Sequence, residues 1–97
     1  MLTLPIKKKW FDMILSGEKQ EEYRTITNYY RSRFFNLWGS KASELRKVKF
    51  RNGYSSTSPS FVAECTLSKG HGRPEWGAEP GKRYYILHII RVEDGAS

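Results

Sequence analysis

Cysteine and long apolar runs are both scarce in this chain, and each shortage limits what the protein can be. Cys65 is the only cysteine among 97 residues, so no disulfide can form within the chain; we expect a reducing, cytoplasmic location. No stretch approaches the roughly 20 apolar residues of a membrane-spanning helix. The apolar residues of Met1–Trp10 precede the lysines Lys7–Lys9, the reverse of a secretory signal. The sequence therefore predicts no targeting segment and no membrane partner.

Motifs for metal or cofactor chemistry are also lacking. The spacing of Cys65, His71 and His88 fits no zinc template. The chain has no G-x-S-x-G, Walker or dinucleotide-binding motif. We therefore expect no metal site and no cofactor.

Aromatic residues are plentiful, and they make a folded domain feasible. Hydrophobic residues form 38% of the chain and aromatic residues 14%. Phe, Tyr and Trp bury large areas, which offsets the entropy of ordering a short chain. The length allows one small core, so we predict a single domain over residues 1–97.

Positive charge is concentrated in the first half of the chain. Lys and Arg number 17 against 10 Asp and Glu, for a formal charge of +7. Residues 1–51 hold 12 basic and 5 acidic side chains, whereas residues 52–97 hold 5 of each. This imbalance favours a polyanionic partner, chiefly nucleic acid. The alternative is charge that serves only solubility.

The hydrophobic pattern predicts an α+β fold. Helical spacing of apolar residues predicts a helix over 7–16, ended by Gly17, and a second helix that Thr27 or Asn28 caps and that runs to about Trp38. Alternation predicts strands at 1–6, 19–26, 47–51, 61–68 and 84–92. The last strand is apolar on both faces, and residues 69–82 are expected to form an irregular loop. Late strands without intervening helices favour a mixed or antiparallel sheet that closes into a small barrel, with the two helices around it.

The most informative segment is the Gly17–Arg24 stretch. Lys19 follows the helix end, and alternation puts Glu22 and Arg24 on one face of the next strand. Lys7 can join them if the first strand pairs beside this one. Such a cluster can receive an anion or a base amino group. The alternative is a surface ladder of ion pairs.

The same residues carry a resemblance. Gly17, Lys19, Glu22 and Arg24 fit the G-x-K-x-x-E-x-R motif of the ASCH domain family. The segment Leu4–Phe11 also resembles that family's opening strand and basic, aromatic helix start, and Pro80–Ile89 resembles its final strand. The resemblance implies a PUA-like β-barrel and a cleft, between barrel and helices, that binds RNA or a nucleotide. It implies a site of Lys7, Lys19, Glu22 and Arg24, with Gly17 as the residue that forms the turn.

The family also suggests an enzymatic alternative. Some members of the family that this chain resembles are amidohydrolases that act on acylated cytidine. In those proteins a threonine stands in the place of Glu22. The glutamate leaves no hydroxyl nucleophile there, and Thr25 falls on the opposite strand face. A small hydrolase, an amidohydrolase or a ribonuclease, would use Lys19 and Glu22 as an acid–base pair.

Other residues could extend a binding surface. Tyr54, beside the Asn52-Gly53 turn, is a candidate for base contact, whereas Trp10 and Tyr23 could stack a base or pack in the core. A basic track could also follow the second helix and the next strand, or these side chains could be a solvated face; they are Arg31, Arg33, Lys47, Lys49 and Arg51. The same track, without the cleft, could bind an acidic protein.

Overall fold

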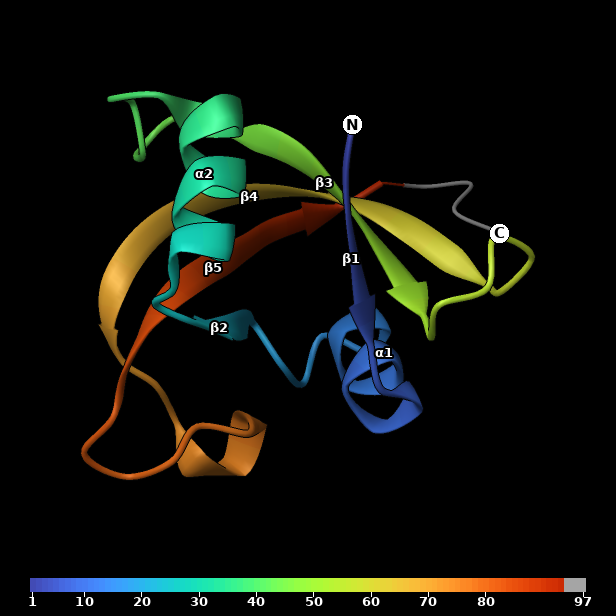
Figure 1. The fold of residues 1–97 in the computed structure, drawn as a ribbon. Coiled ribbons are helices and arrows are strands. Elements are labelled where there is room, and N and C mark those ends of the chain that lie inside the picture. The colour runs from blue at the N-terminus through green and yellow to red at the C-terminus, as the bar shows by residue number, and fades with distance from the viewer. Residues whose placement is uncertain (94–97) are drawn as a thin grey trace.

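Alternating apolar and polar residues build one five-stranded mixed sheet, which curls into a half-barrel with two α-helices packed on it (Figure 1). The computed structural model describes residues 1–93; the rest of the domain predicted over 1–97 lies outside the described residues. The elements follow in the order β1 (Leu2–Ile6), α1 (Lys8–Leu15), β2 (Glu21–Thr25), α2 (Asn28–Trp38), β3 (Arg46–Asn52), β4 (Ser60–His71), the 3-10 helix η1 (Pro74–Trp76) and β5 (Arg83–Val92). The α+β class and the predicted order of strands and helices are therefore confirmed.

The strand order puts the first two strands at opposite edges of the sheet. The order is β1-β3-β4-β5-β2. β1 is parallel to β3, and the other neighbours are antiparallel. β1 therefore does not pair with β2 in the described sheet, and Lys7 does not reach the motif by that pairing. The curl of the sheet brings the two edges near each other instead, since the Arg24 side chain donates to the Pro5 carbonyl at 2.8 Å.

The core lies on the concave face of the sheet. Phe61, Ala63 and Cys65 of β4 are buried there, while Glu64 and Thr66 point to the convex face and are half-buried. Cys65 has no exposed surface, as its position in the alternating pattern predicts. Leu67 continues the inward set but is only partly buried against the core.

Both helices begin and end within a residue of their predicted bounds. Gly17 follows α1 at a φ of 84°, a left-handed conformation that glycine adopts without strain. The Thr27 hydroxyl caps α2 by accepting from the Tyr30 amide at 3.2 Å. Phe34 and Trp38 of α2 are buried against the sheet. The described residues contain no helix whose length and hydropathy would suit a membrane crossing.

The structure differs from the sequence prediction after residue 68. The irregular loop predicted over 69–82 is wrong in its first part, because β4 continues to His71 and pairs with β5 as far as Arg83. Gly70 does not break this ladder, since it lies opposite Tyr84. The last strand is covered on both faces only from Tyr84 to Leu87, and Ile90 is 58% exposed.

Candidate functional site

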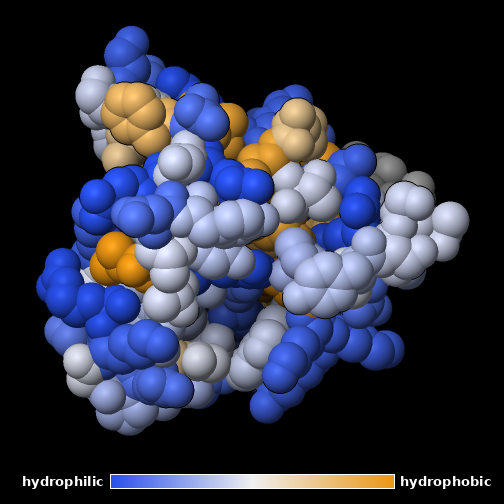
Figure 2. Space-filling view, viewed as in Figure 1, coloured by the Kyte–Doolittle hydropathy of each residue, from blue (hydrophilic) through white to orange (hydrophobic). Residues whose placement is uncertain are grey.

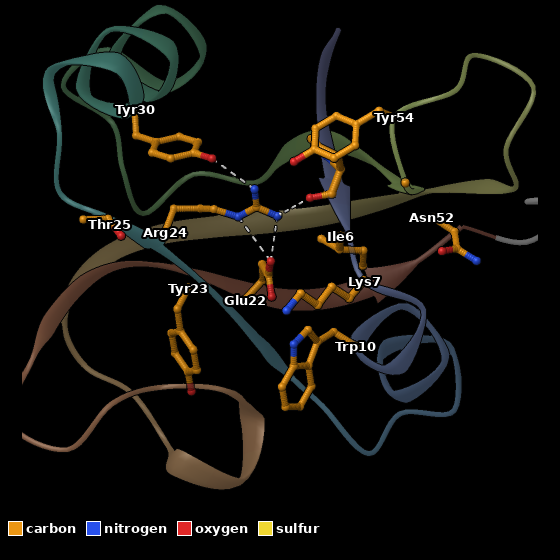
Figure 3. A pocket seen from close by; sticks show the side chains of 12 residues that line it. Ile6, Lys7, Trp10, Glu22, Tyr23, Arg24, Thr25, Tyr30, Asn52 and Tyr54 are labelled. Atoms are coloured by element: carbon orange, nitrogen blue, oxygen red, sulfur yellow. Dashed lines mark hydrogen bonds and ion pairs between the residues drawn. The ribbon is translucent and has the colours of Figure 1, made fainter.

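A pocket of about 450 Å³ opens on the concave side, where β1, α1, β2 and α2 approach one another. The face seen in Figure 2 is mostly hydrophilic and is hollowed near its centre. The pocket volume is within the range usual for small-molecule sites. Its walls come from both edge strands, from both helices and from the turn after β3, and the lining residues are Pro5, Ile6, Lys7, Trp10, Glu22, Tyr23, Arg24, Thr25, Tyr30, Asn52, Gly53 and Tyr54 (Figure 3).

Glu22 and Arg24 meet at the back of this pocket. β-strand alternation puts both side chains on the concave face, and there they bind each other. Arg24 Nη2 and Nε lie 2.7 and 3.2 Å from Glu22 Oε2. Arg24 also donates to the Tyr30 hydroxyl at 3.1 Å. Burial is the largest single influence and works to lower the pKa of Arg24, but the Glu22 carboxylate and the Tyr30 hydroxyl together exceed it and raise that pKa. The pair therefore forms a fixed frame rather than two separate arms that bracket a ligand.

Lys19 lies beneath the pocket rather than on its wall. The residue is 1% exposed, and its ammonium donates to the Trp76 carbonyl at 2.6 Å and lies 3.3 Å from Glu22 Oε1. The same ammonium lies 5.0 and 4.8 Å from the ring centres of Trp10 and Tyr23. Burial lowers the pKa of Lys19, and Glu22 opposes this shift. Lys19, Glu22 and Arg24 thus form one chain of ion pairs below the cavity.

Lys7 and Tyr54 are the predicted residues that face the open part of the pocket. Lys7 extends across the cavity from the start of α1, and Tyr54 is at the rim (Figure 3). Tyr54 is 89% exposed. Within residues 1–93, no carboxylate forms an ion pair with Lys7. The pocket therefore presents a lysine whose charge no described side chain neutralises.

Three more aromatic side chains line the pocket. Trp10 shares the apolar stripe of α1, yet it is only half-buried, and its indole faces the cavity next to Tyr23. Tyr30 has two roles in the structure. It packs against the core with one side and lines the pocket with the other.

The basic residues of β3 lie elsewhere. Val48 and Phe50 are buried on the concave face, so Lys47, Lys49 and Arg51 point to the convex face. Lys47 forms an ion pair with Glu93 at 2.8 Å. These three basic side chains are therefore on the opposite face of the sheet from the pocket.

Among the described residues, the pocket offers aromatic rings, the Lys7 ammonium, which forms no ion pair there, and the Glu22 carboxylate, which Lys19 and Arg24 neutralise. In the described part of the chain, no cluster of three or more His, Cys, Asp or Glu residues could hold a metal ion. No protein-family model, curated protein or solved structure matches the chain.

Proposed function

We propose that this chain is an RNA- or nucleotide-binding domain of the ASCH type, with a PUA-like barrel, and that its ligand occupies the pocket between the sheet and the helices. The observation that carries the proposal is the combination of aromatic walls with the Lys7 ammonium, which no described carboxylate neutralises. A nucleotide needs both features, because its base has a flat face for stacking and its phosphate is an anion.

The expected pose follows from where these groups lie. Lys7 contacts the phosphate, and Tyr54 at the rim stacks on the base. The ion-pair frame of Glu22 and Arg24 holds β1 and β2 at the separation that keeps the pocket open. In this proposal Lys19 supports Glu22 from below and does not touch the ligand.

Binding is favoured over hydrolysis because Lys19 and Glu22 are already held by contacts within the protein. A general acid or base must lie within hydrogen-bonding reach of its substrate. The Lys19 ammonium is directed at the Trp76 carbonyl and at Glu22 Oε1, and Arg24 takes Glu22 Oε2. An amidohydrolase or ribonuclease that used Lys19 and Glu22 would have to break these contacts first.

Titration with uridine 5′-monophosphate and with a short oligouridylate tests the proposal. We expect Lys7→Gln and Tyr54→Ala each to weaken binding roughly fivefold or more, through a lost charged contact and a lost stacking face. Lys8→Gln is the matched control, because Lys8 is exposed, pairs with Asp12 and is not part of the pocket. Binding that neither pocket variant weakens would refute the proposal.

The same samples test the enzymatic alternative. The parent protein is incubated with acylated cytidine and with RNA, and products are followed by chromatography. Turnover that Lys19→Ala and Glu22→Gln abolish, with ligand affinity nearly unchanged, would replace the binding function with a hydrolytic one.

A further inference from the structure

A second groove lies on a different side of α2 from the first pocket. It has a volume of about 230 Å³ and is bounded by α2 and by the parts of β4 and β5 that α2 covers (Figure 1). Arg31 and Phe35 reach it from α2, Lys69 from β4 and Tyr85 from β5. None of these residues lines the first pocket.

The groove carries positive charge that the described chain does not neutralise. Neither Arg31 nor Lys69 forms an ion pair with a carboxylate within residues 1–93. The α2 sequence NYYRSRFFNLW contains two arginines and no acidic residue. The Lys69 ammonium lies 5.4 Å from the centre of the Tyr85 ring. Charge complementarity therefore favours an anionic occupant.

Flat aromatic surface accompanies this charge. Phe35 is 66% exposed at the groove, and Tyr29 is 56% exposed on the same helix. The Arg33 guanidinium stacks on the Tyr29 ring at 3.6 Å. In the groove itself, the exposed Phe35 ring accompanies Arg31 and Lys69. This combination suits stacked bases joined by phosphates better than it suits carboxylate side chains, which have no aromatic ring to stack.

The groove and the first pocket are neighbours across one helix. Tyr30 lines the pocket and Arg31, the next residue, lines the groove. Successive residues of an α-helix project about 100° apart, so these two side chains serve adjacent sides of α2. A flexible chain that leaves the pocket can cross α2 and enter the groove.

We infer that the ligand is a single strand of RNA, not a free nucleotide, and that it crosses α2 with one nucleotide in the pocket and a following one in the groove. This inference rests on the proposed function and extends it. Arg31 and Lys69 contact phosphates of the strand, and Phe35 stacks on the second base.

The experiment compares uridine 5′-monophosphate with oligouridylates of increasing length. We expect affinity to rise when the oligomer becomes long enough to reach the groove. Arg31→Gln with Lys69→Gln should weaken oligomer binding by roughly tenfold or more and leave the affinity for the mononucleotide unchanged. The log–log salt dependence should become shallower by about 0.7 for each lost phosphate contact. Phe35→Ala should lower only the affinity for the oligomer.

Lys47→Gln with Lys49→Gln is the matched control, since it removes the same charge from the convex face. Equal weakening by both double variants would mean that net charge alone acts, and the inference would be wrong. The inference would also be wrong if the mononucleotide and every oligomer bound with equal affinity. A third contradicting result would be an acidic peptide that displaces the oligomer from the parent protein but not from the variant with Arg31→Gln and Lys69→Gln. Any of these contradicting results would concern the groove alone, and the pocket could still bind a nucleotide. Absence of mononucleotide binding, in contrast, would refute the proposed function itself.

Discussion

Lys19 shows how one side chain can connect distant parts of this fold. Its ammonium joins the Trp76 carbonyl, in the η1 segment, to Glu22 of β2. A lysine with so little exposed surface needs such partners, because an unpaired buried charge is costly. Lys19, which the motif alone would assign to ligand binding, thus holds the η1 segment against the sheet.

Replacing this lysine should therefore destabilise the whole protein. Lys19→Met keeps an unbranched side chain that is slightly shorter than lysine, but leaves the Trp76 carbonyl and Glu22 Oε1 without their donor. We expect a loss of about 1–3 kcal/mol in the free energy of unfolding, measured by urea denaturation. The control Lys41→Met, at an exposed lysine, should stay within about 0.5 kcal/mol of the parent. Equal stability of the two variants would contradict a structural role for Lys19.

Cys65 should make stability depend on pH in the alkaline range. Burial raises the pKa of its thiol from 9.0 to about 12. Above pH 9 the unfolded thiol loses its proton while the folded thiol keeps it, so the native state binds more protons and the free energy of unfolding falls as pH rises. Between pH 9 and about pH 10.5 this loss is about 1–2 kcal/mol.

Comparison of the parent with Cys65→Ala isolates this effect. Burial also raises the pKa of Tyr23, which acts in the same direction, and lowers the pKa of Lys19, which acts in the opposite one. Both groups are present in both proteins, so the difference between their pH profiles reports Cys65 alone. Parallel profiles from urea denaturation would mean that the thiol ionises equally in both states.

At the scale of elements, local patterns predicted most of the fold. The apolar spacing of α1, the Thr27 cap of α2 and the alternation through Cys65 are all present in the structure. The prediction failed where a distant partner decides the outcome. Gly70 and His71 look like loop residues in sequence, yet their pairing with Tyr84 and Arg83 keeps them in β4. Tertiary hydrogen bonds of this kind leave no local pattern.

The end of β4 gives an element-scale prediction. A Cβ on Gly72 would lie 2.6 Å from the Tyr23 ring and 2.7 Å from the Ala78 side chain. Gly72→Ala should therefore destabilise the protein by about 1–3 kcal/mol and displace Tyr23, which lines the pocket. Gly70→Ala is the matched control, because its added methyl would meet only Ile86 Cδ1, at 3.4 Å. Thermal and urea denaturation measure the loss of stability in both variants. If Gly72→Ala and Gly70→Ala lost the same free energy of unfolding, the Tyr23 side chain would move aside at no cost and the prediction would be wrong.

For the molecule as a whole, the curl of the sheet decides which predicted residues meet. Lys7 follows the edge strand β1 and Arg24 lies in the opposite edge strand β2, and no ladder connects these strands within the described residues. Sequence alternation can assign a residue to a face but cannot measure how far a sheet bends. Lys7 was expected to join the cluster if β1 paired beside β2; it lines the pocket instead because the sheet curls.

The bond between these edges supplies the last prediction. Arg24 donates to the Pro5 carbonyl at 2.8 Å while it holds Glu22 and Tyr30, so one planar side chain closes the open side of the half-barrel. Lysine keeps the charge but lacks the forked set of donors. We expect Arg24→Lys to raise the amide hydrogen-exchange rates of the edge strands β1 and β2 selectively. Exchange in the central strand β4 should change only as much as global stability falls. Lys8→Gln, which removes an exposed ion pair near β1, should leave both edges as protected as in the parent. If Arg24→Lys accelerated exchange equally in β1, β2 and β4, the guanidinium would act on overall stability alone and would not join the two edges.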